Sequence, residues 1–238
     1  MKHYVIGDVH AHYDTLIKLI DKLDKNSNII FVGDLIDRGP KSKEVINLVR
    51  NSPNYISVLG NHEDMMIKYG KNFIKNYPDN IFNDSLLMWY YNGGLETLKS
   101  YNLIKQEDNK IICTNNKKAL NEFYEDIKWM ETLPIYLKMP HYINQKPVVI
   151  THANCIDAWP PNNLWEFKYF ALWNRNPPKH ECKIFNIHGH TPVAFNAQIT
   201  PCYANIDTGC YLNPPTYGKL SAFCIDTQEV ISVQKVEI

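Results

Sequence analysis

The chain lacks several features that would assign it to a common class of protein. Its 25 basic and 25 acidic residues cancel, so no overall charge favours nucleic acid or an anionic membrane surface, and any phosphate affinity must be local. No apolar run approaches the ~20 residues that a membrane-spanning helix needs. The N-terminus also lacks the long apolar segment of a signal peptide. We therefore expect a cytoplasmic protein that binds neither nucleic acid nor membranes; its oligomeric state stays open.

Closely spaced cysteines are also missing. The six cysteines include no Cys-x-x-Cys pair and are scattered along the chain: Cys113, Cys155, Cys182, Cys202, Cys210 and Cys224. Zinc fingers and dithiol redox sites require such pairs, so both are poor interpretations. We expect reduced cysteines, as is usual in the cytoplasm.

The sequence does contain a large apolar fraction, 45%, which is enough for the core of one α/β domain. Residues 1–62 predict a parallel sheet, because helical crossovers separate their strands. The expected strands are Tyr4–Ile6, Ile29–Val32 and Ile56–Leu59, and the helices lie near Tyr13–Leu23 and Ser42–Val49.

The rest of the chain predicts a helical middle followed by more strands. The helical pattern covers Asp64–Lys75, Ser85–Tyr90, Leu95–Tyr101 and Leu120–Met130, with a turn at Asn92-Gly93-Gly94. The later strands are Ile135–Lys138, Val148–Ile150, Ile184–Ile187, Ala204–Ile206, Leu220–Ile225 and Val230–Val236, with loops at 159–163 and 213–216. No linker or repeat is visible. We therefore expect one domain, 1–238, with a helical insertion at about 64–133 that covers a shared site.

Five apolar, β-branched runs each end in a residue that can bind a metal ion. These strand ends read VIGDVH, FVGDLIDRG, VLGNHE, VVITH and IFNIHGH. Active-site groups of open α/β sheets collect beyond the carboxyl ends of the strands. The candidate ligands are Asp8, His10, Asp34, Asn61, His152 and His190.

Oxygen and imidazole ligands without thiolate suit manganese, the expected metal, with Fe, Zn, Co or Ni as alternatives. Six ligands are too many for one catalytic ion with an open position. They fit two ions that share a bridging carboxylate, which activate water to hydroxide and clamp a phosphoryl group. The sequence therefore predicts a dinuclear metal site for phosphoryl chemistry.

The same motifs supply groups that metals cannot. His62 follows Asn61 and is suited to protonate a leaving alkoxide, and Asp37 can fix its tautomer. Arg38 offers a bidentate fork for phosphate oxygens. Glycines precede most of the ligands, where tight turns or close backbone approach are expected: Gly7, Gly33, Gly60 and Gly189.

These motifs in order resemble the metallo-dependent phosphoprotein phosphatase family. GDVHAHYD, GDLIDRGP and GNHE, a lone strand-end histidine and GHT carry the resemblance, which extends to WYYNGGLETLKSY, LPIYL, ALWNR, GHTPV and NIDTG. The bacterial and phage branch, which includes diadenosine tetraphosphate hydrolases, is the most similar part of that family.

The resemblance implies a β-sandwich of two mixed sheets flanked by helices. It also implies that Asp8 and His10 hold the first metal, that Asp34 bridges, and that the second metal is held by Asn61, His152 and His190. His62 with Asp37 would be the acid pair, and Arg38 and Arg175 would bind phosphate. His188 and Asp207 have open roles: His188 as ligand or packing residue, Asp207 as a partner of a histidine or a turn cap.

Two single positions and one loop depart from the family pattern. Ala11 and Asn154 each stand where the family commonly has glycine, and a longer loop at 210–217 replaces a short Gly-rich turn. The loop lies where it could reshape the substrate pocket.

The expected activity is hydrolysis of phosphomonoesters by hydroxide held between the metals, with His62 as general acid. A serine/threonine, or dual-specificity, protein phosphatase is the first interpretation, and a dinucleoside polyphosphate hydrolase is the alternative. For the alternative, Trp89, Tyr90, Tyr91, Tyr211 and Tyr217 are candidates to stack an adenine. The non-enzyme interpretation is an inactive metal-binding scaffold.

Overall fold

A computed structural model describes residues 1–79, 81, 83–108 and 110–237 of the chain. The helices are α1 (Tyr13–Ile20), α2 (Ser42–Asn51), α3 (Asn61–Met65), α4 (Lys71–Asn76), α5 (Leu87–Trp89), α6 (Leu95–Ser100), α7 (Lys117–Met130) and α8 (Leu164–Trp173). The strands of the first half are β1 (His3–Ile6), β2 (Asn28–Phe31), β3 (Tyr55–Ser57), β4 (Ile104–Glu107) and β5 (Lys110–Cys113). Those of the second half are β6 (Tyr136–Ile143), β7 (Lys146–Thr151), β8 (Phe185–His188), β9 (Gln198–Ile199), β10 (Tyr203–Asn205), β11 (Lys219–Cys224) and β12 (Val230–Gln234).

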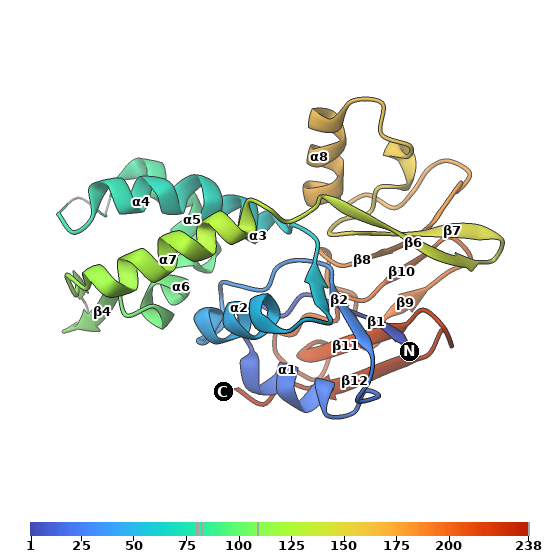
Figure 1. Ribbon diagram of the computed structural model, residues 1–238, viewed down its shortest axis with the longest axis horizontal. Coiled ribbons are helices and arrows are strands. Elements are labelled where there is room, and N and C mark those ends of the chain that lie inside the picture. The colour runs from blue at the N-terminus through green and yellow to red at the C-terminus, as the bar shows by residue number, and fades with distance from the viewer. Residues whose placement is uncertain (80, 82, 109, 238) are drawn as a thin grey trace.

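Two five-stranded mixed sheets form the centre of the molecule (Figure 1). The first has the order β12-β11-β1-β2-β3, in which β1, β2 and β3 are parallel and β11 and β12 are antiparallel to their neighbours. The second has the order β6-β7-β8-β10-β9, with β7, β8 and β10 parallel. The expected fold class and the parallel pairing of the first three strands are confirmed.

The central strands β1, β2, β8 and β11 are buried on both faces, which explains their largely apolar sequences. In β1, Val5 faces the core between the two sheets, while Tyr4 and Ile6 face a second core under the helices. β2 repeats this alternation, with Ile30 in the inner core and Phe31 in the outer one. Helices α1 and α2 close the outer core with a set of apolar side chains spaced three or four apart: Leu16, Leu19, Val45, Ile46 and Val49.

The other sheet has a smaller outer core under α8. Phe167 and Ala171 of α8 pack with Val149 of β7 and with Ile184 just before β8. The sandwich is therefore covered by helices on both outer faces.

The helical middle of the chain extends to one side of the sheets (Figure 1). It contains α3 to α7 but also the hairpin β4–β5, which lies between the expected helices Leu95–Tyr101 and Leu120–Met130 and was not predicted from the sequence. Gly93 has φ of 102° and interrupts the helical path at the expected turn. The single domain with an insertion at about 64–133 stays a prediction, and residues 80, 82, 109 and 238 lie outside the described residues.

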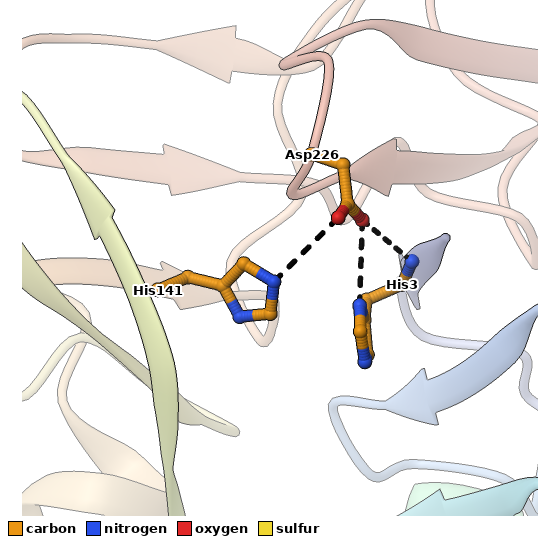
Figure 2. A group of neighbouring side chains, drawn as sticks. All are labelled: His3, His141 and Asp226. Atoms are coloured by element: carbon orange, nitrogen blue, oxygen red, sulfur yellow. Dashed lines mark hydrogen bonds and ion pairs between the residues drawn. The ribbon is translucent and has the colours of Figure 1, made fainter. Parts of the chain in front are cut away.

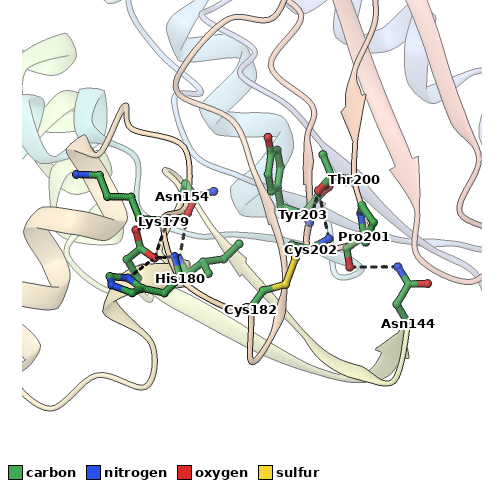
Figure 3. Close-up of a disulfide and its surroundings, with 11 residues drawn as sticks. Asn144, Asn154, Lys179, His180, Cys182, Thr200, Pro201, Cys202 and Tyr203 are labelled. Carbon is green, nitrogen blue, oxygen red and sulfur yellow. Dashed lines mark hydrogen bonds and ion pairs between the residues drawn. A yellow bond between two sulfur atoms is a disulfide. The ribbon is translucent and has the colours of Figure 1, made fainter.

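A disulfide joins Cys182 and Cys202, which corrects the expectation that all six cysteines are reduced (Figure 3). Their Cα atoms are 5.8 Å apart, within the usual range for a disulfide. The bridge ties the segment before β8 to the start of β10. The other four cysteines are free: Cys113, Cys155, Cys210 and Cys224.

The loops expected at 159–163 and 213–216 are outside regular strands and α-helices, as predicted. Among the described residues, none of the helices is both long and apolar enough to span a membrane.

Candidate metal centre and acid pair

The candidate metal ligands follow the carboxyl ends of strands in both sheets. In chain order they come after β1, β2, β3, β7 and β8: Asp8, His10, Asp34, Asn61, His152 and His190. Each is less than 5% exposed. Burial of a polar side chain costs free energy unless the side chain has a hydrogen-bond or metal partner. The concentration of buried polar side chains at this edge of the sandwich therefore indicates a functional site.

The backbone at these strand ends adopts an unusual conformation. Non-glycine residues with positive φ concentrate here: His10 (46°), Ala11 (60°), Asp34 (51°), Asp37 (68°), Arg38 (71°) and His190 (69°). Such backbone costs free energy and clusters at functional sites. Two backbone segments also approach each other closely here. A Cβ atom on Gly33 would lie 2.5 Å from the backbone N of Gly60, so this position requires glycine.

Asp34 lies at the centre of the candidate ligands. Its Oδ1 accepts the backbone N–H of His62 at 3.0 Å and lies 3.4 Å from His152 Nε2. Its Oδ2 lies 3.6 Å from His10 Nε2. Burial opposes ionisation of Asp34, but the neighbouring imidazoles outweigh it and hold its pKa below the ordinary value. The two oxygens of one carboxylate therefore face two different histidine clusters.

On the Oδ1 side, His152, His190 and Asn61 converge. His152 Nδ1 lies 2.9 Å from the carbonyl oxygen of Val32, so Nδ1 carries the proton and Nε2 presents a lone pair. That Nε2 is 2.7 Å from Asn61 Oδ1 and 3.0 Å from His190 Nδ1. His190 Nδ1 is in turn 2.9 Å from Asn61 Oδ1. His152 Nε2, His190 Nδ1 and Asn61 Oδ1 are thus three neighbouring hydrogen-bond acceptors with at most one proton among them.

The protonation of these two histidines also suits metal binding. Burial lowers the pKa of His152, and burial followed by the charge of His152 lowers that of His190 to about 2. Both rings are therefore neutral and keep lone pairs. His190 Nε2 is buried without a hydrogen-bond partner. Two imidazoles, an amide oxygen and a carboxylate fit a divalent ion such as Mn, Fe or Zn.

On the Oδ2 side, His10 is oriented in the same way, but its ligand atom is already engaged. Its Nδ1 lies 3.0 Å from the carbonyl oxygen of Ile36, and its Nε2 accepts a hydrogen bond from Arg38 Nη1 at 2.9 Å. The Arg38 guanidinium also lies over the Tyr211 ring, 3.9 Å from its centroid. A cation that binds His10 would have to displace this guanidinium.

Asp8 is placed less directly at the centre. Both of its carboxylate oxygens lie 3.2 Å from the backbone N–H of His190, which donates to them. Among the described residues, the compact groups of ligand atoms here are His10–Asp34–His62 and Asp34–His152–His190, and neither includes Asp8. Its role as a metal ligand stays a prediction.

His62 and Asp37 form a buried pair beside Asp34. His62 Nδ1 donates to Asp37 Oδ2 at 2.7 Å, which leaves Nε2 directed at the site. Burial alone would lower the pKa of His62, but the charges of Asp34 and Asp37 and this hydrogen bond raise it above 6.5. Trp89 Nε1 and the Thr97 hydroxyl also donate to Asp37, at 3.0 and 2.6 Å. The pair can therefore hold a proton ready for transfer.

The sequence did not predict these roles for Trp89 and Thr97. Trp89, considered for stacking an adenine, is fully buried, and so is Tyr90 apart from 7% of its surface. Neither ring can stack a substrate base. Tyr91 is largely exposed, and Tyr211 contacts His10 and Arg38.

Arg175 contacts His190, whereas Arg38 contacts His10. Arg175 Nη1 donates to the carbonyl oxygen of His190 at 3.3 Å. A cavity of about 220 Å³ opens beside it, lined in part by His188 and Asn154. His188 Nε2 contacts the Asn154 amide at 3.3 Å, which is the packing role rather than the ligand role considered for it.

Glu63 is a site residue that the sequence analysis missed, although it belongs to the GNHE motif. Its carboxylate accepts the backbone N–H groups of Asp34, Leu35 and Gly60 at 2.8, 2.8 and 3.0 Å. Burial and the charge of Asp34 raise its pKa to about 7. The capping-box spacing of Gly60 and Glu63 could have revealed this role, because a glutamate three residues after an N-cap reaches back to its backbone.

Asp207 caps a turn with one carboxylate oxygen, while its other oxygen has no hydrogen-bond partner among the described residues. Its Oδ1 accepts the backbone N–H of Gly209 at 2.9 Å, which caps a turn, while its buried Oδ2 has no partner. Burial, supported by the charge of Asp34, raises its pKa to about 7 despite that hydrogen bond.

The chain matches the family model described as calcineurin-like phosphoesterase over residues 1–199. It is 25% identical over 265 residues to the asymmetrical bis(5′-nucleosyl)-tetraphosphatase PrpE of Bacillus velezensis, covering 98% of this chain and 93% of that protein. It is 27% identical over 242 residues to serine/threonine-protein phosphatase 2 of Salmonella typhimurium, covering 93% and 92%. A solved structure of a putative diadenosine tetraphosphatase is similar in fold, with a TM-score of 0.62 at 18% identity over 99% of this chain and 94% of that one.

Proposed function

Because the chain belongs to the calcineurin-like phosphoesterase family, we propose that its hydrolysis of phosphate esters takes place at Asp34, with two divalent cations and His62 as the acid. The observation that carries this proposal is the pair of Asp34 oxygens, which face two histidine clusters beside a buried acid pair. An inactive scaffold would have no need for the His62–Asp37 pair.

The residues divide into two metal-binding sets that share Asp34. Asp8, His10 and Asp34 would hold one ion, and Asp34, Asn61, His152 and His190 would hold the other. Manganese is the proposed metal, since all donors are oxygen or imidazole nitrogen. When bound, the two ions would supply an activated water for attack on phosphorus and charge neutralisation at the phosphoryl oxygens.

The protein side chains account for the remaining steps. Arg38 beside His10 and Arg175 beside His190 would bind the non-bridging phosphoryl oxygens. As the bond between phosphorus and the leaving oxygen breaks, His62 Nε2 would donate its proton to that oxygen. Asp37 accepts from Nδ1 and stabilises the protonated ring before transfer. No side chain needs to form a bond to phosphorus.

We propose phosphomonoesters, in particular phosphoserine and phosphothreonine in proteins, as the substrate class. Arg38 and Arg175 are two of the chain's three arginines, and the third, Arg50, pairs with Asp126. Two guanidinium groups match the charge of one phosphoryl group better than that of a tetraphosphate chain. The similarity to the Salmonella phosphatase over nearly its whole length supports this class.

A dinucleoside polyphosphate is the second candidate. It is supported by full-length similarity to the asymmetrical tetraphosphatase of Bacillus velezensis. Two structural features favour it as well: the Tyr211 ring beside Arg38, and the 220 Å³ cavity lined in part by Arg175. The extended 210–217 loop supplies Tyr211, so it bears directly on this choice.

One experiment separates the two candidates. Phosphate release is measured from a phosphopeptide panel and from diadenosine tetraphosphate at equal concentrations, with Mn²⁺ and with chelator, for the native protein and Tyr211→Ala. Peptide preference that survives Tyr211→Ala supports the phosphatase. Dinucleotide preference that Tyr211→Ala reduces, with nucleotide products, supports the second candidate. Activity insensitive to chelator contradicts both.

A cytoplasmic location stays a prediction, and the states of the cysteines support two different compartments. Four free cysteines fit a reducing compartment, whereas the Cys182–Cys202 disulfide fits an oxidising one. A thiol count on protein purified from its source, alkylated at lysis, would settle the state: six thiols favour the cytoplasm and four favour an oxidising compartment.

A further inference from the structure

A second cluster of imidazole and carboxylate groups lies outside the centre described above. His3, His141 and Asp226 bring one potential ligand atom each to within 4.8 Å of the others (Figure 2). His3 starts β1, whose other end leads to Asp8. The cluster therefore lies at the opposite end of that strand, roughly 17 Å from Asp8 for five extended residues. No step of the phosphoesterase reaction uses it.

In the cluster each histidine lies next to a different oxygen of Asp226, at a distance longer than that of a good hydrogen bond. His3 Nδ1 is 3.4 Å from Asp226 Oδ2, and His141 Nε2 is 3.6 Å from Asp226 Oδ1. Good hydrogen bonds between such groups are about 2.7–3.2 Å long. Two ligand atoms of a tetrahedral zinc ion, each about 2.0–2.1 Å from the metal, are separated by roughly 3.3 Å. His3 Nδ1 is, moreover, buried without a hydrogen-bond partner.

Three separate elements are needed to build the cluster. His3 belongs to the first sheet, His141 to β6 of the second, and Asp226 to the turn after β11. The register of β6 against β7 shifts between Lys138 and Tyr142, and such irregularities redirect side chains. The backbone N–H of His3 donates to Asp226 Oδ2 at 2.7 Å, which fixes the carboxylate in place.

The surroundings also suit a bound ion. The three side chains are 22–32% exposed, so water and ions can reach them. A cavity of about 410 Å³, lined by His3 and by Asn28, lies alongside. The Asn28 amide nitrogen Nδ2 lies 3.2 Å from His3 Nε2, so Asn28 donates to that ring nitrogen in this structure. A 180° rotation of the amide would place its oxygen there; Asn28 would then accept from Nε2–H and leave Nδ1 free to bind metal, as partners of metal-bound histidines do.

We propose that His3, His141 and Asp226 bind a zinc ion that links the two sheets at the end opposite the catalytic centre. Two imidazoles and one carboxylate select zinc or a similar transition metal over magnesium or calcium. Water would complete the tetrahedron, because three protein ligands leave one position open. The ion would stabilise the sandwich, since it binds the folded arrangement of three distant segments and not the unfolded chain.

The test counts zinc on the full chain. Native protein, His141→Ala and Asp226→Asn are equilibrated with Zn²⁺, dialysed, and analysed for zinc per chain by mass spectrometry. The matched control is His180→Ala, because His180 also pairs with a carboxylate, Asp157, but has no second imidazole there. We expect the native protein and the control to hold one ion more than either variant. An equal count in all four proteins overturns the proposal.

Two further measurements separate this site from the catalytic one. Asp226→Asn keeps the side-chain shape, so it guards against misfolding of His141→Ala, and both should retain Mn²⁺-dependent hydrolysis within about twofold. Asn28→Asp should bind zinc about tenfold more tightly, because a carboxylate partner raises the basicity of a ligating histidine. Weaker zinc binding by Asn28→Asp, or zinc loss from the variants only together with catalytic activity, contradicts a separate site.

Discussion

On the Oδ1 side of Asp34, imidazole and amide acceptors face one another with too few protons between them, whereas on the Oδ2 side His10 already accepts a hydrogen bond from Arg38. The side chains are of similar kinds, and His10 and His152 are each oriented by a backbone carbonyl. The two sides differ because on the Oδ2 side the Arg38 guanidinium already donates a hydrogen bond to His10 Nε2, the atom that would bind a metal ion.

This comparison suggests that the two ions bind with different strength. The His152 side has acceptors that only a cation or a proton can satisfy, so it should bind first. The His10 side must release Arg38 before it binds, and the released guanidinium then becomes available to a phosphoryl group. Arg38 would thus couple ion binding to substrate binding.

Removing the charge of Asp34, the carboxylate that both sides share, should abolish the difference in ion affinity between the two sides. In Asp34→Asn both sides lose the carboxylate that they share, so we expect both ions to be lost and hydrolysis to fall to background. Metal analysis of the purified variant, with Asp64→Asn as the control carboxylate, checks this. A variant that still held two ions would show that Asp34 does not bridge them.

Removing the acid should leave both sides intact. His62→Asn should keep both ions but lose about 10²–10⁴-fold in kcat, the usual contribution of a general acid. The native kcat should fall as pH rises through the raised pKa of His62, above 6.5, because the ring then loses the proton that it donates. That alkaline limb should be absent in His62→Asn. Parallel loss of metal and activity would argue that His62 is a ligand instead.

Removing Arg38, which competes with a metal ion for His10 Nε2, should change ion affinity on the His10 side alone. Arg38→Ala frees His10 Nε2, so Mn²⁺ affinity of the weaker site should rise about tenfold, the equivalent of one charge-assisted hydrogen bond. Hydrolysis should nevertheless fall about 10²-fold with the loss of a phosphoryl-binding group. Calorimetric titration with Mn²⁺ measures the first effect, and Arg50→Ala serves as the control. Unchanged affinity of both sites would refute the competition.

The smallest expected effect concerns the backbone at the His10 side. Ala11 has φ of 60°, a conformation that glycine adopts without the steric cost of a Cβ. Ala11→Gly should therefore stabilise the fold by at most about 1 kcal/mol, since the greater freedom of glycine in the unfolded chain offsets part of the gain. Urea unfolding would measure it; a clear loss of stability would mean that the Ala11 methyl group packs favourably.

The convergence of the candidate ligands could be predicted from the sequence because each of them ends a local pattern. An apolar run and its terminal Asp, Asn or His are adjacent in the chain, and parallel pairing brings such ends to one edge. The acid pair was predicted for the same reason, from the closeness of His62 to Asn61.

Contacts between distant segments could not be predicted in this way. Trp89 and Thr97 donate to Asp37 across 52 and 60 residues, and nothing in their local sequence marks them as its partners. The pairing of Cys182 with Cys202 is equally invisible, because spacing alone does not determine connectivity. The β4–β5 hairpin is different: its two short apolar segments flank polar turn residues, a signal that was present but overlooked.

The disulfide also determines what a protease could do to this enzyme. Cys182 and Cys202 close a covalent ring of chain that contains β8 and His190. Phe195 lies within that ring and is 58% exposed, so the loop between the GHT motif and β9 offers an accessible cleavage point. A single cut there would leave the two fragments joined, with every candidate ligand still on one covalently connected molecule until a reductant separates them.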